Sequence, residues 1–322
     1  MPNDYFERFF SGDPLAASRL MSIIERGGEQ AEQTLHTLFP RLGRGYRIGI
    51  TGLTGAGKSS LINRLIVNYR ERGDTVGVIA EDPTSPFTGG AILGDRIRMQ
   101  DRTGDPGVFI RSIASRGSET GLSTCAAELA DVLDAFGRDI ILLETIGVGQ
   151  LEHRIRFNAF TSVVVLTPDA GDDVQGLKSG IMEIGEIFVV NKADRPKSER
   201  FAEELRSMLE LRTAGREWHP PVIPTVAREG KGIGELVAAI DAHRDYIRAS
   251  GVMEEKRIDS LRNRITTAAE DKLKEIFWGN QSTKDTIDRI FDQVKNGRLS
   301  PYEAAGSLIA AFKKEISEGS SR

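Results

Sequence analysis

Hydrophobic residues between positions 46 and 248 gather into short runs that are separated by longer amphipathic stretches. Seven runs are expected to be strands, at residues 46–51, 76–81, 108–113, 140–144, 162–167, 187–191 and 221–225. They are rich in Val and Ile and do not alternate with polar residues, which is typical of parallel strands covered on both faces. The segments between them are long enough for crossover helices. We therefore expect a doubly wound, mostly parallel α/β domain at 46–248, with a ligand site at the carboxyl ends of its strands.

Both ends of the chain have the spacing of amphipathic helices instead. In residues 1–45, Asp13 and Pro14 are suited to cap and begin a helix, and apolar stripes follow. In residues 249–322, apolar positions recur at threes and fours between 258 and 276, and a capping box at 300–303 predicts a last helix. The wide stripe at 258–276 fits a subunit interface or packing within the chain. The sequence thus predicts helical N- and C-terminal extensions.

The first chemical signal lies between the first strand and the helix after it. Residues 52–59, GLTGAGKS, match G-x-x-x-x-G-K-[ST]. Glycine allows close approach of phosphate, and a helix N-terminus attracts it. Lys58 would contact the β- and γ-phosphates and Ser59 would bind magnesium. The alternative is a chance glycine turn. The residues expected to contact the nucleotide are Gly52, Gly55, Ala56, Gly57, Lys58, Ser59 and Ser60.

A second signal follows the strand at 187–191 and identifies the base. Residues 191–194, Asn-Lys-Ala-Asp, form an N-K-x-D element. The Asp194 carboxylate can accept hydrogen bonds from the N1–H and the 2-amino group of guanine, a donor pair that adenine lacks. Asn191 can bond the N7/O6 edge and tie neighbouring loops, and the stem of Lys192 can cover the base. The alternative is a polar turn in which Asp194 caps a helix. Residues 225–229 would supply the last base contact, at Ala227.

A third signal follows the strand at 140–144. Glu144-Thr145-Ile146-Gly147 occupies the place of the D-x-x-G segment, so Glu144 is expected to meet magnesium and the Gly147 N–H the γ-phosphate. Hydrolysis needs an oriented water. Val148 cannot orient one, and Gln150 would reach the phosphate only after the loop rearranges. We therefore expect slow hydrolysis of GTP to GDP by the isolated protein.

Two longer segments identify a protein family far more specifically than the G-x-x-x-x-G-K-[ST] motif does. Residues 81–99, EDPTSPFTGGAILGDRIRM, and 144–150, ETIGVGQ, resemble the MeaB/ArgK/MMAA family of P-loop GTPases, and the resemblance spans nearly the whole chain. It implies a chaperone of adenosylcobalamin-dependent acyl-CoA mutases, chiefly methylmalonyl-CoA mutase. In that family the GTP cycle gates cobalamin delivery and helps to expel damaged cofactor, and the C-terminal helices form a homodimer. The chain departs from the family at Leu53-Thr54, where proline is usual, and at Ser60, where threonine is usual. Neither change removes a phosphate contact.

The resemblance also assigns roles to single residues. It makes Asp82 and Asp95, with Ser59 and Glu144, the residues that hold magnesium, a set of oxygen donors that suits this ion. Asp82 could instead begin a turn before Pro83, and Asp95 could cap a helix. Residues 169–180 resemble a switch loop that contacts the mutase. Its Gln175 and Lys178 would act near the phosphates, unless the segment is only a solvated acidic loop.

Composition and charge narrow the alternatives. The net charge is −4 and the pI is about 5.8, which gives no electrostatic case for nucleic acid or an anionic membrane. The single cysteine, Cys125, excludes an internal disulfide. It and four scattered histidines argue against a metal-insertion GTPase of the hydrogenase or urease maturation type, which remains the main rival. The N-K-x-D element argues against an ATP-dependent transport kinase, and the lack of D-x-H-x-x-G argues against cobalamin binding by the chain itself. With no membrane-spanning stretch and no basic leader, a cytoplasmic location is expected.

Overall fold

A computed structural model describes residues 4–82, 104–114, 124–145, 153–170 and 181–319. The chain divides into two compact units, residues 1–256 and 257–322. The first unit holds the sheet and the candidate site. The second is helical, and each unit is described by itself.

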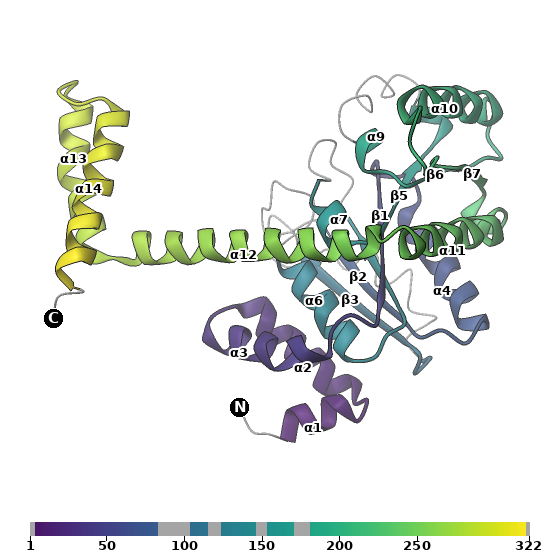
Figure 1. The fold of residues 1–322 in the computed structure, drawn as a ribbon, viewed down its shortest axis with the longest axis horizontal. Helices are drawn as coiled ribbons and strands as arrows, with labels where there is room; N and C mark the ends of the chain where they lie inside the picture. Colours follow the sequence, from purple (N-terminus) through teal and green to yellow (C-terminus); the bar gives the residue numbers. More distant parts are fainter. Residues whose placement is uncertain (1–3, 83–103, 115–123, 146–152, 171–180, 320–322) are drawn as a thin grey trace. The chain divides into compact units, whose positions relative to one another are not determined.

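The described part of the first unit is built on a sheet of seven strands, all parallel to their neighbours (Figure 1). Each predicted strand is confirmed to within one residue at either end. The strands are β1 (Tyr46–Gly52), β2 (Val76–Asp82), β3 (Val108–Ala114), β4 (Ile140–Glu144), β5 (Thr161–Leu166), β6 (Ile187–Asn191) and β7 (Val222–Thr225). A doubly wound parallel sheet is the fold class that the sequence predicts.

The strand order places the carboxyl end of β1 where the direction of winding reverses. The order is β3-β2-β4-β1-β5-β6-β7, so β1 lies between β4 and β5. In the register of these pairs, Ile50 lies beside Glu144 on one side and Val163 on the other. In open α/β sheets ligands bind at such a switch point. The loop after β1 and the end of β4 are therefore neighbours.

Helices cover both faces of the sheet, as the non-alternating strands predict. On one face, α4 (Lys58–Glu71) and α11 (Ile233–Ala249) share a core with strand residues such as Leu142. On the other, α6 (Thr124–Ala135) packs on neighbours such as Leu143, and α10 (Ser198–Thr213) packs on β5 and β6. The short elements are α7 (His153–Asn158), η3 (Pro168–Ala170), α9 (Ile181–Ile184) and η4 (Ala227–Glu229).

The N-terminal helices complete the layer that contains α6. They are α1 (Asp4–Phe10), α2 (Pro14–Arg26), α3 (Glu29–Leu38) and the short η1 (Phe39–Arg41). Asp13 caps α2 as predicted, because its carboxylate accepts from the Leu15 N–H at 2.8 Å. Leu20 is fully buried in the core that includes α6 and the sheet. The guanidinium of Arg111 in β3 donates to Glu25 at 2.6 Å, which ties α2 to the edge strand.

The second unit contains most of α12 (Val252–Gly279), together with α13 (Gln281–Lys295) and α14 (Pro301–Gly319). The capping box is present, since the Ser300 N–H donates to Glu303 at 2.9 Å and the Glu303 N–H donates to the Ser300 hydroxyl at 3.2 Å. The rings of Phe277 and Phe312 pack 4.9 Å apart. No side chain of α12 is buried, and Ile265 is 71% exposed. The predicted apolar stripe is therefore largely exposed in the described part of the second unit.

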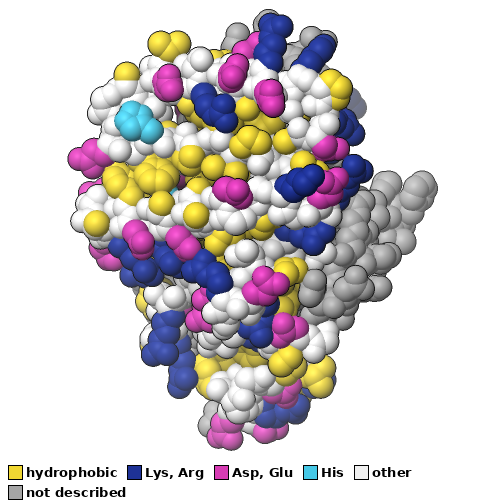
Figure 2. All heavy atoms as spheres, turned by 90° about the vertical axis from the view of Figure 1, so that its right-hand side faces the viewer, with side chains coloured by type: hydrophobic (Ala, Val, Ile, Leu, Met, Phe, Trp, Pro, Cys, Tyr) yellow, Lys and Arg dark blue, Asp and Glu magenta, His cyan; other side chains and the backbone are white. Residues whose placement is uncertain are grey.

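The surface has no large area of one charge on the face in Figure 2, where basic and acidic side chains are intermixed. Among the described residues, no helix combines the length and the apolar character that a membrane span requires.

Candidate functional site

The loop between β1 and α4 is shaped by its glycines. Gly52, Gly55 and Gly57 have φ angles of 133°, 78° and 93°, a region that favours glycine. A Cβ at Gly52 would lie 2.0 Å from the Val165 carbonyl oxygen, and one at Gly57 would lie 2.3 Å from Asn191 Nδ2. The loop therefore lies tightly over β5 and β6 and leads directly into α4 at Lys58. It presents a helix N-terminus, which binds anions such as phosphate.

The two polar residues that begin α4 are both buried. The Lys58 ammonium donates to the carbonyl oxygens of Gly52 at 2.8 Å and Leu53 at 3.2 Å, and so lies against the loop. The Ser59 hydroxyl donates to Glu144 Oε1 at 2.8 Å. Residues from two separate sequence motifs thus meet at the carboxyl ends of β1 and β4.

The Ser59 and Glu144 oxygens are the kind of donor that magnesium takes. No group of three or more His, Cys, Asp or Glu side chains suited to a metal occurs among the residues that the structure describes. Magnesium does not require one, because it usually keeps several waters and binds one or two carboxylates together with substrate phosphates. The donors present therefore fit a magnesium ion that arrives with a phosphate ligand.

Two threonines beside this pair were not singled out from the sequence. The hydroxyls of Thr51 and Thr145 lie 2.8 Å apart, and both residues are buried. The Thr145 N–H also donates to the Ile50 carbonyl oxygen at 3.1 Å. These bonds join the ends of β1 and β4 and so hold Glu144 close to the loop. A polar residue ending each of two apolar strands is the signal that could have identified them.

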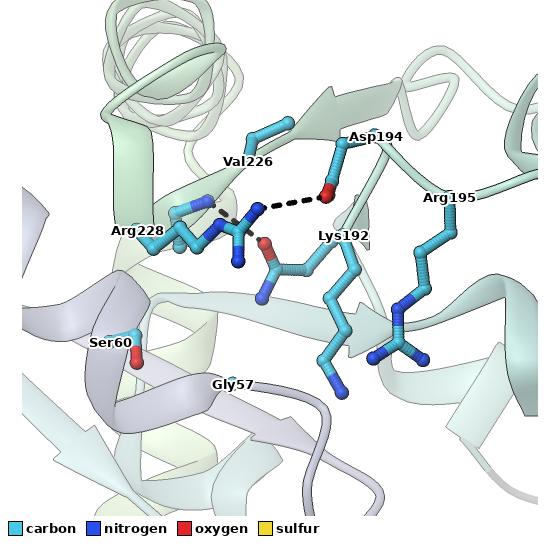
Figure 3. A pocket seen from close by; sticks show the side chains of 9 residues that line it. Gly57, Ser60, Lys192, Asp194, Arg195, Val226 and Arg228 are labelled. Carbon is cyan, nitrogen blue, oxygen red and sulfur yellow. Dashed lines mark hydrogen bonds and ion pairs between the residues drawn. The ribbon is translucent and has the colours of Figure 1, made fainter.

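The glycine-rich loop between β1 and α4, residues 52–59, is called the phosphate loop from here on. A cavity of about 210 Å³ lies next to it. It is lined by residues of that loop and of the loops that follow β6 and β7 (Figure 3). Lys192 and Asp194 enter it from the β6 side and Arg228 from the β7 side. The carboxyl ends of neighbouring strands thus bring the predicted base-binding residues together.

Asn191 holds the three loops in place. Its amide nitrogen donates to the Ala56 carbonyl oxygen at 2.8 Å, and its Oδ1 accepts from the Thr225 hydroxyl and the Ala227 N–H, each at 3.1 Å. The side chain is buried. This is the tying role that the sequence suggested for Asn191.

The charged side chains of the cavity each have a partner. Lys192 has a φ of 59°, and its ammonium donates to the Gly55 carbonyl oxygen at 2.8 Å. Asp194 Oδ2 accepts from the Arg228 guanidinium at 3.3 Å. Arg195 pairs with Asp169, just beyond β5. The phosphate loop and the cavity are thus linked through Lys192.

The loop at 227–229 is fixed by residues outside the motifs. Arg64 of α4 donates to the carbonyl oxygens of Ala227, at 2.9 Å, and Arg228. A hydrogen bond from Lys231 lowers the pKa of the Glu229 carboxyl, so this group is anionic at neutral pH. Arg64 could not have been identified from sequence, because it lies 163 positions from Ala227.

Some predicted site residues lie outside the described ranges. They are Asp95, Gly147, Gln150, Gln175 and Lys178. Asp82 is described only as the last residue of β2, paired with Ala114 of β3. The described site therefore consists of the phosphate loop, Glu144 and the cavity.

Comparison with known proteins gives one consistent result. The family model described as "Methylmalonyl Co-A mutase-associated GTPase MeaB" matches residues 17–282. A putative GTPase of Pyrococcus abyssi is 44% identical over 99% of this chain and 98% of that protein. The "Methylmalonic aciduria type A homolog, mitochondrial" of Caenorhabditis elegans is 31% identical over 83% of this chain and 68% of that protein. The crystal structure of a LAO/AO transport system kinase has a TM-score of 0.72 at 25% identity and covers 97% of both chains.

Proposed function

This chain belongs to the family of methylmalonyl-CoA mutase-associated GTPases, and we propose that it is a GTP-driven chaperone of an adenosylcobalamin-dependent acyl-CoA mutase. The family resemblance predicted from sequence is confirmed, and the chain is a GTPase. The observation that carries the proposal is the family match over residues 17–282. Methylmalonyl-CoA mutase is the partner we propose, because the family is named for its association with that enzyme.

We propose that GTP binds with its phosphates on the loop at 52–60 and its base in the cavity. Asp194 would read the guanine edge, and Asn191, Lys192 and Ala227 would complete the base site. The positions of the loops support this, since both halves of the site lie on the edge formed by the carboxyl ends of β1, β6 and β7.

Magnesium would be held by Ser59 and Glu144, with Asp82 and Asp95 as further acids. When bound it would neutralise charge on the β- and γ-phosphates. The chain itself holds the Ser59 hydroxyl 2.8 Å from Glu144 Oε1 and places Lys58 beside the loop. Gln150 remains the residue we propose to orient the attacking water.

The loop at 169–180 is the proposed link to the mutase. It follows β5, which pairs directly with β1, the strand that leads into the phosphate loop. Its first residue, Asp169, pairs with Arg195 at the cavity. A loop attached to both halves of the site is suited to report which nucleotide is bound.

The exposed stripe of α12 supports a homodimer formed through residues 249–322. Its side chains, such as Leu273 at 62% exposure, lie on a helix with no buried residue. Exposed apolar patches of this kind mark protein interfaces.

Nothing in the described residues favours a metal-insertion GTPase. Burial lowers the pKa of His243 to about 3, and its ring nitrogen is bonded to the Thr161 hydroxyl at 2.8 Å. His219 lies against Thr213. Neither histidine belongs to a metal-binding group within the described ranges.

Replacing both Gln175 and Lys178 with alanine is expected to leave basal GTP hydrolysis within about twofold and to abolish its stimulation by the mutase. The reason is that the partner would order these side chains near the phosphates, which adds the orientation that Val148 lacks. The measurement is the steady-state rate of phosphate release with and without purified methylmalonyl-CoA mutase.

The matched control is Gln33→Ala with Arg200→Ala, which removes an exposed amide and an exposed positive charge from α3 and α10. This control should be stimulated as fully as the wild type. Stimulation that survives in the Gln175/Lys178 variant would show that the loop is not the link.

A further inference from the structure

The carboxylate proposed to read guanine already has a cationic partner inside the chain. Arg228 extends across the cavity to Asp194 (Figure 3), and its Nη2 lies 3.3 Å from Asp194 Oδ2. The two residues come from different loops, which follow β7 and β6. The pair therefore lies in the cavity at the position where the base edge would lie.

Arg228 and guanine offer the Asp194 carboxylate similar hydrogen-bond donors. An arginine guanidinium presents several N–H donors in one plane. Guanine presents its N1–H and 2-amino group in the same way, because that edge of the ring is itself a guanidine unit. A base that uses both oxygens of Asp194 needs Oδ2, the oxygen that Arg228 contacts from within the cavity lining. Arg228 and guanine would therefore compete for the same space beside this oxygen.

The structure allows the side chain to leave while its backbone stays fixed. Arg64 holds the carbonyl oxygens of Ala227 and Arg228, and Asn191 holds the Ala227 N–H. The Arg228 side chain itself is 76% exposed. A second carboxylate, Glu229, lies 3.6 Å from the same guanidinium nitrogen. The guanidinium can thus release Asp194 and keep its contact with Glu229 while the loop stays in place.

We propose that Arg228 binds Asp194 in the nucleotide-free protein and must be displaced before guanine can bind. Arg228 would then limit the rate at which guanine nucleotides associate. The inference rests on the proposed reading of the base by Asp194. A site that is open only part of the time binds more weakly by that fraction. Because an exposed ion pair contributes little, the expected effect is a few-fold.

The test is the binding kinetics of GDP that carries a fluorescent group on its ribose. Arg228→Ala should raise the association rate constant about threefold and leave the dissociation rate constant unchanged. The control Arg200→Ala removes a comparably exposed arginine, 81% exposed and paired with Glu204 at 2.8 Å on α10, and should leave both constants unchanged. The affinity for inorganic pyrophosphate, which needs no base site, should be the same in the wild type and Arg228→Ala.

Other outcomes overturn the proposal. An unchanged or slower association would mean that the pair does not obstruct the site. Faster dissociation would mean that Arg228 covers the bound base instead. A changed affinity for pyrophosphate would mean a general effect of charge. Asp194→Asn tests base reading by Asp194 separately from the role of Arg228. Full affinity for GDP in this variant would contradict base reading by Asp194.

Discussion

Asp194→Asn is expected to lower the affinity for GDP by about 100-fold or more and to raise the relative affinity for xanthosine diphosphate. The carboxylate of Asp194 would accept two hydrogen bonds from guanine, and each hydrogen bond to a charged group is worth about 1.5–3 kcal/mol. Asparagine offers one acceptor and one donor, which match the N1–H and the 2-oxo group of xanthine. Calorimetric titration with both nucleotides measures the change.

The wild type supplies the control for this experiment. It should bind GTP far more tightly than ATP, because adenine has no donor pair for Asp194. Equal binding of ATP and GTP by the wild type, or full GDP affinity in Asp194→Asn, would contradict guanine reading at this residue.

Lys58→Ala and Ser59→Ala are expected to impair different steps. Lys58 provides positive charge at the phosphates, so its loss should weaken triphosphate binding and lower the hydrolysis rate by about 100-fold. Ser59 provides a magnesium ligand, so its loss should mainly raise the magnesium concentration needed for half-maximal hydrolysis, by about tenfold. The measurement is the hydrolysis rate over a range of magnesium concentrations.

High magnesium should largely restore Ser59→Ala and should not restore Lys58→Ala. Both side chains are buried, so the melting temperature of each variant must be compared with that of the wild type. Equal losses for the two variants at every magnesium concentration would contradict the separate roles.

The strands could be predicted because their signal is local. In β5, for example, all six residues are buried, and the run from Val163 to Leu166 is apolar without interruption. No single strand determines the order β3-β2-β4-β1-β5-β6-β7, because the order depends on pairing between strands far apart in the sequence. The long crossovers predicted only that the sheet would be parallel and doubly wound.

The N-terminal helices show the limit of reading spacing alone. The apolar stripe of α2 predicts a helix, yet it does not say what the stripe covers. In the structure Leu20 and Met21 belong to the same core as α6 and the sheet. Spacing within one helix carries no information about a partner more than a hundred residues away.

In the candidate site, too, local motifs could be predicted from sequence and long-range contacts could not. The phosphate loop and the N-K-x-D element could be found because each is a short motif with a local structural context. The pairing of Arg228 with Asp194, the bonds from Arg64 and the Thr51–Thr145 contact depend on loops that only the folded sheet brings together. These second contacts decide how the motif residues are held, and no spacing rule predicts them.

The most direct test of the proposed function is the affinity of the protein for methylmalonyl-CoA mutase, measured by calorimetry with GDP and with a non-hydrolysable GTP analogue. A nucleotide-dependent chaperone must bind its partner with different affinity in the two states, and by linkage the mutase must change the ratio of the two nucleotide affinities by the same factor. We predict a difference of about fivefold or more, with that reciprocal change. Equal affinity in both states would contradict nucleotide control of the complex, and no binding in either state would leave the chain as a GTPase without this partner.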